Sequence, residues 1–433
     1  MIHLLYDIIL LLALPVIVPY HLYRARKRGR PAALSERFGF IAAEPHGMDG
    51  TIWVHAVSVG ETIAVKPLLK ALRNTFPGRR IVLSNGTETG RAIAATLREV
   101  DRCIYFPFDY PWAADRLLQT IAPALIIVVE TEIWPAFLRR ARRRGIPVML
   151  ANGRISDRSF AGYLRLAWFF RRVLPDFDAF CMQSAEDGRR IAAIGAPADR
   201  VRVAGNLKYD IPPVTVTAER QREVRARYGI PTGVPVLVAG STHKGEDEPV
   251  ITAYRRLLDE GRELFLVLVP RHPERAPEVA ALLAQAGLSC RLRSGLGDHP
   301  EPAGRNGVLL VDTVGELMAC YAASDLVFVG GSLVPTGGHN ILEPASLGRP
   351  LLFGPHMTNF REIASLALAA DAGRQVSDAG GLAVAWGALL DDGELCRAMG
   401  DRGRRIVEEN SGAVRRHLQA ATELLAAPAE RRP

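Results

Sequence analysis

The chain has 433 residues, 48% of them apolar, and a formal net charge of +8. This length exceeds one ordinary hydrophobic core, so two domains of about 150–200 residues are expected. The positive charge comes mostly from arginine, which suits phosphates and anionic surfaces; no basic recognition helix or aromatic-basic motif points to nucleic acid. The five cysteines have no paired spacing, which argues against a disulfide framework or a zinc site and indicates a reducing compartment: Cys103, Cys181, Cys290, Cys320 and Cys396.

The chain begins with an apolar stretch, residues 2–20, which as a helix would measure about 28 Å, close to the thickness of a bilayer core. A basic flank follows it, made of Arg24, Arg26, Lys27, Arg28 and Arg30. Because a cleaved signal peptide carries its charge ahead of the apolar stretch, we predict an uncleaved anchor over 1–22, with everything after it in the cytoplasm. The anchor either spans the membrane or lies shallowly in it. Asp7, Pro15 and Pro19 weaken the spanning version more than the shallow one. The alternative is a helix buried in the first domain.

Apolar runs then alternate with helical patterns over residues 23–212, which predicts a parallel sheet covered by helices on both faces. The expected strands are 52–58, 81–84, 124–130, 148–152, 179–183 and 201–204, and the expected helices include 61–73 and 89–99.

The alternation stops near Ile211-Pro212-Pro213, which we take as a hinge, and a polar helix is expected over 216–228. A second series of strands follows at 236–240, 264–269, 308–311, 326–330 and 351–353. The fold class is therefore α/β, with a second open unit over 213–433 whose last helices have the option of packing back on the first domain. Two such units facing each other form a cleft, and ligands bind at the carboxyl ends of the strands.

The first polar strand end contains Ser58, Gly60 and Glu61. Ser58 and Gly60 make the turn, and Glu61 opens the next helix, where the helix dipole stabilises a carboxylate that could act as a general base. The alternative is a glutamate that only complements the dipole.

Three further strand ends of the first unit carry charged side chains. Glu130 and Glu132 follow one strand and point to the same side while the strand persists, unless this is a solvated strand end. Arg154 follows the next strand and could grip a phosphate. Lys208, near the domain junction, could meet a developing negative charge, or could simply be a surface lysine.

In the second unit, four consecutive strand ends are polar and should converge at one mouth. The first carries Ser241, Thr242 and His243, and the second carries Arg271 and His272, which suit a phosphate or a carboxylate. The third is the turn Asp312–Leu317, whose residues Val314, Gly315 and Glu316 have backbone groups available to read a base edge.

The fourth strand end is a glycine-rich loop, Gly330–Ala345, that runs into a short helix. Gly337 and Gly338 let the backbone approach a ligand, and the free N–H groups of the helix start would bind an anion. Within the run Asn340, Ile341, Leu342 and Glu343, the glutamate could reach a sugar hydroxyl. The alternative is a strand–turn–helix connection that uses glycine only for turning.

The sequence contains no Walker loop, no Gly-x-Gly-x-x-Gly after the first strand, and no His/Cys cluster with metal spacing. The Asp-x-Asp run at 176–178 precedes a strand and should therefore lie away from the mouth. We expect metal-independent chemistry without a cofactor.

Five segments, at 55–61, 130–135, 152–156, 271–275 and 337–344, resemble the Kdo (3-deoxy-D-manno-octulosonic acid) transferases of lipopolysaccharide assembly. The match runs from the anchor to about residue 365, and Gly153, where the family often has alanine, is a departure without expected consequence. The resemblance implies a GT-B glycosyltransferase, two Rossmann-like domains with an N-terminal anchor in the cell inner membrane and the catalytic domains on its cytoplasmic face.

The resemblance also implies an inverting transfer of Kdo from CMP-Kdo to a lipid A precursor (lipid IVA). It makes Glu61 the general base, and Glu130 and Lys208 the groups that support the transition state, with Glu132 as the alternative to Glu130. It assigns the binding of CMP to Arg271, His272, the 312–317 turn and residues 340–343.

Two rival functions remain open. One is another GT-B nucleotide-sugar enzyme, a UDP-sugar transferase or an epimerase, which CMP and UDP binding would distinguish. The other is a membrane-associated binding module without activity. If the chain is an enzyme instead, Glu61→Ala should abolish turnover and leave CMP binding largely intact.

Overall fold

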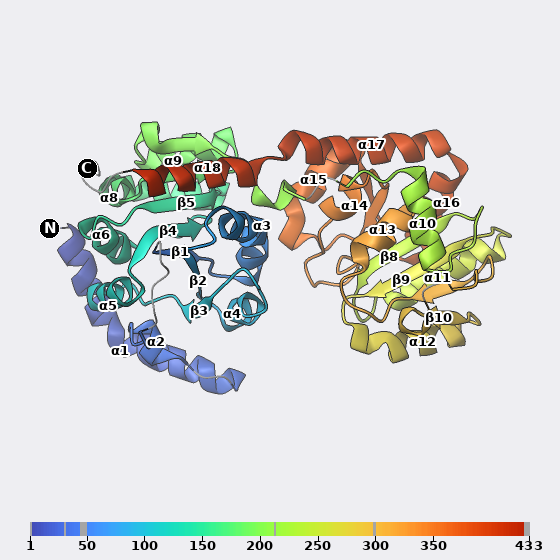
Figure 1. Cartoon of the computed structure of the whole chain (residues 1–433), viewed down its shortest axis with the longest axis horizontal. Helices are drawn as coiled ribbons and strands as arrows, with labels where there is room; N and C mark the ends of the chain where they lie inside the picture. Colours follow the sequence, from blue (N-terminus) through green and yellow to red (C-terminus); the bar gives the residue numbers. More distant parts are fainter. Residues whose placement is uncertain (1, 30–31, 44–49, 212–213, 298–299, 428–433) are drawn as a thin grey trace. The chain divides into compact units, whose positions relative to one another are not determined.

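The computed structural model describes residues 2–29, 32–43, 50–211, 214–297 and 300–427, which form two compact units (Figure 1). Unit 1 comprises Met1–Asp210 and Ser411–Pro433, and unit 2 comprises Ile211–Asn410. Arg30 of the basic flank and Pro212-Pro213 of the expected hinge lie outside the described residues.

Unit 1 is built on a seven-stranded parallel sheet in the order β3-β2-β1-β4-β5-β6-β7. The strands are β1 (Thr51–His55), β2 (Arg80–Asn85), β3 (Arg102–Tyr105), β4 (Pro123–Val129), β5 (Val148–Gly153), β6 (Ala179–Met182) and β7 (Val201–Val203). The helices are α1 (Ile2–Arg28), α2 (Leu34–Arg37), α3 (Val59–Thr75), α4 (Glu88–Ala94), α5 (Pro111–Ile121), α6 (Pro135–Arg143), α7 (Asp157–Arg165), α8 (Ala167–Val173), α9 (Ala185–Ile194) and α18 (Ala413–Ala426).

Both faces of this sheet are covered, as a parallel sheet requires. Successive residues of β1 enter different cores: Ile52 and Val54 pack in one buried cluster and Trp53 in the other. The C-terminal helix α18 supplies Ala413, Ala420 and Ala421 to the first of these clusters, so unit 1 contains both ends of the chain.

Unit 2 repeats the plan with the strand order β10-β11-β9-β8-β12-β13-β14. Its strands are β8 (Val236–Thr242), β9 (Phe265–Pro270), β10 (Cys290–Leu292), β11 (Val308–Leu310), β12 (Leu326–Val329), β13 (Leu351–Phe353) and β14 (Gly373–Gln375). Its helices are α10 (Ala218–Arg227), α11 (Asp247–Asp259), α12 (Ala276–Gln285), α13 (Leu317–Ala323), α14 (Leu342–Ser346), α15 (Arg361–Ala369), α16 (Ala379–Asp391) and α17 (Gly393–Asn410).

Each sheet has one point where the strand order reverses, between β1 and β4 in unit 1 and between β8 and β12 in unit 2. The loops that follow these neighbouring strands diverge to opposite faces, and the crevice left between them is where open α/β sheets bind ligands. The α/β class and every expected strand are confirmed. Three strands are additional, β3, β10 and β14, and each lies at a sheet edge.

The apolar N-terminal stretch forms helix α1, which continues beyond the expected anchor into the basic flank. Residues Leu5–Lys27 are long and apolar enough to cross a membrane, with a mean hydropathy of 1.9. Figure 1 shows α1 following the outer edge of unit 1, past α5 and α2.

Candidate active site

Glu61 lies in the first turn of α3, immediately after β1, and its carboxylate closes a capping box. The Ser58 hydroxyl donates to Glu61 Oε1 at 2.8 Å, and the Val57 N–H donates to Oε2 at 2.6 Å. In return the Glu61 N–H donates to Ser58 Oγ at 3.3 Å. The alternative considered from sequence, a glutamate serving the helix end, is therefore partly correct, because Glu61 does stabilise the start of α3.

The same carboxylate belongs to a group of three, with Glu130 and Glu132 from the turn after β4. Since β1 and β4 are neighbours at the reversal of strand order, the loops that carry these glutamates border the same crevice, and their charges influence one another. Burial raises the pKa of Glu61, and the charge of Glu130 raises it further against the hydrogen bonds from Ser58 and Val57. Glu130 itself adopts a left-handed backbone, φ 60°, which is uncommon outside glycine and is a form of strain found at functional sites.

Glu132 is the most perturbed of the three: burial, then the charges of Glu61 and Glu130, raise its pKa to about 7 from an ordinary 4.5. A carboxyl that binds its proton more tightly in the native state stabilises the fold below the unfolded pKa, and that contribution is lost as the pH rises through about 7.

We expect Tm to fall less between about pH 5 and about pH 8 in Glu132→Gln than in the wild type. Calorimetric scans at both pH values measure this, with Glu409→Gln on the exposed surface of α17 as the control. An unchanged difference in Tm would contradict the raised pKa.

The strand ends beyond β4 are joined by a buried network around Asn152, whose backbone is also left-handed at φ 56°. Its Oδ1 accepts from the Leu207 N–H at 3.0 Å, which fixes the short helical turn that carries Lys208. Its own N–H donates to Nε2 of His417, a fully buried residue of α18, at 2.9 Å. Burial lowers the pKa of His417 to about 4, so the ring is neutral and can accept. Lys208 is half-buried and Arg154 exposed, both at the carboxyl edge of the sheet.

In unit 2, three histidines meet where the strand order reverses. His243 Nε2 lies 2.8 Å from Nε2 of His339, and the two rings stack with centroids 5.1 Å apart. The His272 ring stands edge-on to His243 at 5.8 Å. Burial first, and then His243 and the positive charges of Arg271 and His272, lower the pKa of His339 to about 4. The half-buried rings of His243 and His339 both have a lowered pKa and therefore favour the neutral form, while Arg271 and His272 are exposed and the Arg271 guanidinium supplies the positive charge that an anion site needs.

The glycine-rich loop after β12 is held by a residue that the sequence analysis did not select, Glu246. Its fully buried carboxylate accepts from the N–H groups of Gly331, Ser332 and Leu333 at 2.6–2.8 Å, and from the N–H of His243 at 2.9 Å. These loop amides are thus already paired within the protein. A sequence signal existed, the acidic run that opens α11, but it is equally typical of a helix N-terminus.

The next part of the loop is explained by packing. Gly337 and Gly338 have φ of 101° and 77°, and a Cβ on either would come within 2.4 Å of Asn359 or Met357. Beyond them, the Leu342 N–H donates to Asn340 Oδ1 at 3.1 Å, so this amide at the start of α14 is also paired. The turning role of these glycines is accounted for, and their part in donor binding stays a prediction.

Two carboxylates at this mouth, Glu343 and Glu316, differ in the hydrogen bonds they already accept and in the direction of their pKa shifts. Burial raises the pKa of Glu343, which Asn340 Nδ2 contacts at 3.4 Å, and Ile341 and Leu342 are buried beside it. Glu316 instead accepts from Tyr228, Arg293 and Thr313, contacts that outweigh its burial and lower its pKa. Glu316 therefore holds its turn in place. The residues before it in the turn are open to solvent: Val314 is 86% exposed, and Gly315 has open space where a Cβ would lie.

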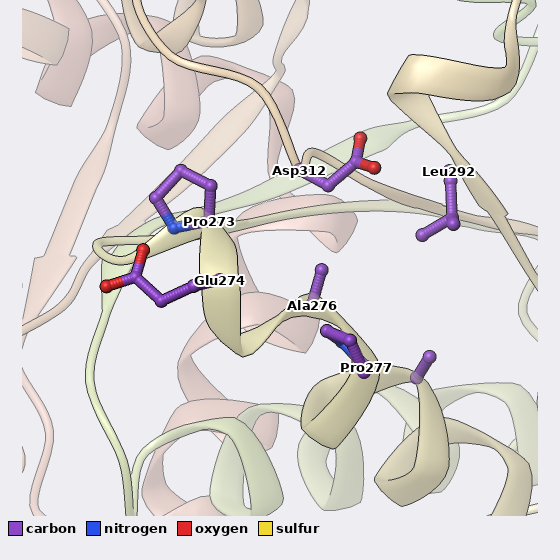
Figure 2. Close-up of a pocket in the computed structure, with 7 residues that line it drawn as sticks. Pro273, Glu274, Ala276, Pro277, Leu292 and Asp312 are labelled. Atoms are coloured by element: carbon purple, nitrogen blue, oxygen red, sulfur yellow. The ribbon is translucent and has the colours of Figure 1, made fainter.

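A pocket of about 480 Å³ borders this turn and is lined by Pro273, Glu274, Ala276, Pro277, Ala280, Leu292 and Asp312. Figure 2 shows the start of α12 on one side of it and Asp312 with Leu292 on the other. Small apolar walls beside two carboxylates, Glu274 and Asp312, suit a flat, partly polar ring.

The Ser241 backbone is left-handed at φ 58°, and the Thr242 hydroxyl donates to buried Asp247 at 2.7 Å, so both help to shape the end of β8. The Asp-x-Asp run lies at the amino end of β6, as predicted: Asp176 pairs with Arg142 at 3.1 Å and Asp178 accepts from the Val148 N–H at 2.8 Å. Among the described residues, no group of three His, Cys, Asp or Glu side chains is arranged to hold a metal ion.

Comparison with known proteins gives consistent results. A family model described as 3-deoxy-D-manno-octulosonic-acid transferase (kdotransferase) matches residues 32–211. The 3-deoxy-D-manno-octulosonic acid transferase of Haemophilus influenzae is 35% identical over 89% of this chain and 90% of its own length. The protein of the same name from Bordetella pertussis is 37% identical, over 93% and 94%.

The fold is also found among solved structures. UDP-GlcNAc 2-epimerase from Neisseria meningitidis, bound to UDP-GlcNAc, superposes with a TM-score of 0.53 over 86% of this chain and 100% of that one, at 14% identity. At this identity the likeness shows the fold alone, and the predicted GT-B class is confirmed.

Proposed function

The chain belongs to the 3-deoxy-D-manno-octulosonic acid (Kdo) transferase family, and from that premise we propose that it transfers Kdo from CMP-Kdo to lipid IVA, a lipid A precursor, at the cytoplasmic face of the inner membrane. It is a glycosyltransferase. The observation that carries the proposed mechanism is the meeting of Glu61 with Glu130 and Glu132 at the strand-order reversal of unit 1.

Glu61 acts as the general base. It takes the proton from an acceptor hydroxyl, the oxygen forms a bond to the anomeric carbon of Kdo, and the bond from that carbon to the CMP oxygen breaks with inversion. A base with a raised pKa holds the proton more readily at neutral pH, and burial of Glu61 first, then the charge of Glu130, raise its pKa. Lys208 and Glu130 support charge that develops during the transfer.

CMP binds to unit 2. Arg271 and His272 offer positive charge to its phosphate, and the Val314-Gly315 turn and the pocket beside it suit its base. Glu343, half-buried and carrying a raised pKa, suits a neutral ribose hydroxyl. Because CMP leaves with its own phosphate already neutralised by these side chains, the transfer needs no metal ion.

The acceptor is an amphiphile with phosphates, and unit 1 fits such a molecule in two respects. It carries the apolar helix α1, and it exposes many arginines on α6, α7 and α8. Anionic surfaces attract such basic residues.

Incubation of the purified protein with CMP-Kdo and lipid IVA, followed by mass spectrometry of the lipid, tests the reaction. The expected product gains one or more Kdo residues, and the gain persists in EDTA. An unmodified lipid would refute the acceptor, whereas activity that EDTA abolishes would refute metal independence only.

The donor separates this proposal from a UDP-sugar enzyme of the same fold. We expect CMP to raise the Tm of the protein and UDP at equal concentration to leave it unchanged, because binding to the native state alone stabilises it by mass action. Thermal scans with each nucleotide measure this. A larger shift with UDP would overturn the CMP assignment.

A further inference from the structure

Helix α1 is fastened to unit 1 along most of its length. Near its start the Tyr6 hydroxyl donates to Asp109 at 2.8 Å, and Asp7 accepts two hydrogen bonds from Arg139 at 2.7 and 2.9 Å. Further along, Tyr110 donates to the Leu10 carbonyl oxygen at 2.8 Å. These contacts account for the acidic residue in an apolar helix.

The far end is attached as well. The His21 ring packs against Phe108 at 4.9 Å, and Ala25 is buried. From Tyr6 to Ala25 the attached part covers twenty residues, or about 28 Å of helix. This is close to the full hydrocarbon thickness of a bilayer, about 30 Å.

The opposite face of α1 is apolar and exposed. It consists of Leu5, Ile8, Leu12, Val16, Tyr20 and Tyr23, which recur at helical spacing and contain no charge. Leu12 is 73% exposed and Val16 69%. We call this set the apolar stripe.

Unit 1 itself exposes further apolar side chains near the start of α1. Tyr6 and Phe169 of α8 lie with ring centroids 5.9 Å apart, and next to Phe169 the ring of Trp168 is 54% exposed. Leu164 and Leu166 are exposed just before it, among Arg165, Arg171 and Arg172. Exposed tryptophan and leucine among arginines are typical of the interfacial region of an anionic bilayer.

These observations conflict with a membrane-spanning α1. If α1 crossed the bilayer while attached along this length, the unit 1 surface beside it would enter the hydrocarbon too. Helix α6, which packs against α1, carries Arg140, Arg142 and Arg143, and charged side chains facing lipid are costly.

We propose that α1 lies in the plane of the membrane, with its apolar stripe inserted at the headgroup boundary of an anionic phospholipid leaflet and unit 1 resting on the same leaflet. The inference rests on the proposed function, transfer to a lipid at a membrane. In this interfacial attachment both ends of α1 stay on the cytoplasmic side.

Spin labels at single cysteines replacing Leu5, Leu12 and Tyr23 test the orientation, in a background with the native cysteines replaced by alanine and transfer verified. The full-length protein is added to vesicles of phosphatidylethanolamine and phosphatidylglycerol. We expect all three labels at a similar shallow depth, about 5–10 Å into the headgroup boundary. A Leu12 label near the midplane, with Leu5 and Tyr23 labels at opposite interfaces, would overturn the in-plane arrangement but not membrane association.

Charge substitutions test whether the apolar stripe itself binds the membrane. Leu12→Glu should weaken vesicle co-sedimentation at least tenfold, while Val384→Glu, at an equally exposed apolar position of α16 in unit 2, should not change it. Both variants should retain CMP binding. Three outcomes would each refute the inference: equal effects of the two substitutions, a stripe covered by a second copy of the chain instead of lipid, or a wild type that does not bind vesicles. The third outcome would also remove the membrane from the proposed function.

Discussion

Glu61→Gln lowers kcat for Kdo transfer by about 10²–10⁴-fold, the usual contribution of a general base, while the Kd for CMP is unchanged. The glutamine keeps the shape of the side chain and can accept one of the two hydrogen bonds that the carboxylate now accepts from Val57 and Ser58. It cannot take a proton from the acceptor. Single-turnover rates with saturating CMP-Kdo and calorimetric titration with CMP measure the two quantities.

The structural role of Glu61 requires a matched control, and Ser58→Ala provides it. This variant removes the hydroxyl from the capping box but leaves the carboxylate in place, so it should cost about 0.5–2 kcal/mol of stability and little activity. If the two variants lost stability equally and activity equally, Glu61 would be a capping residue and the base would have to be sought elsewhere.

Glu246→Ala is expected to be the most destabilising single change in unit 2. It leaves the N–H groups of His243, Gly331, Ser332 and Leu333 without their shared acceptor in a buried place. Each buried donor that is left without an acceptor costs about 1–3 kcal/mol, and four such donors are affected here. Urea unfolding measures the loss of stability, and CMP titration of the folded fraction should show weaker binding because the loop before Asn340 and Glu343 is released.

Glu248→Ala is the control, since this glutamate lies two residues further in α11, on the exposed surface. It should leave both stability and CMP affinity unchanged. Equal behaviour of the two variants would mean that the loop keeps its shape without Glu246 and that its amides are available to a ligand.

The central strands could be predicted from sequence because strands buried on both faces are continuous apolar runs. The strands that were missed, β3, β10 and β14, are three or four residues long and carry arginines, and each pairs with the sheet on one side only. Short polar edge strands look like loops in a single sequence, and only the neighbouring strand gives them their conformation.

The positions of the candidate site residues were predictable to the same limited extent. Polar residues after strands placed Glu61, Glu130, Arg271 and His272 at the carboxyl edges of the sheets, because the chain itself brings strand ends to one edge; their roles stay predictions. Glu246, whose carboxylate holds the glycine-rich loop, could not be predicted, because it lies 85 residues from Gly331 and the two come together only in the folded chain. The same holds for His417, which is 265 residues from Asn152.

The position of α18 has a consequence for biosynthesis. This last helix completes the core of unit 1 with Ala413, Ala420 and Ala421, and its His417 closes the network around Asn152. Domains generally fold as units while the chain is synthesised, from the N-terminus onward. Here unit 1 cannot complete its core in that order: part of its apolar surface stays uncovered until the whole of unit 2 has been translated and α18 follows it.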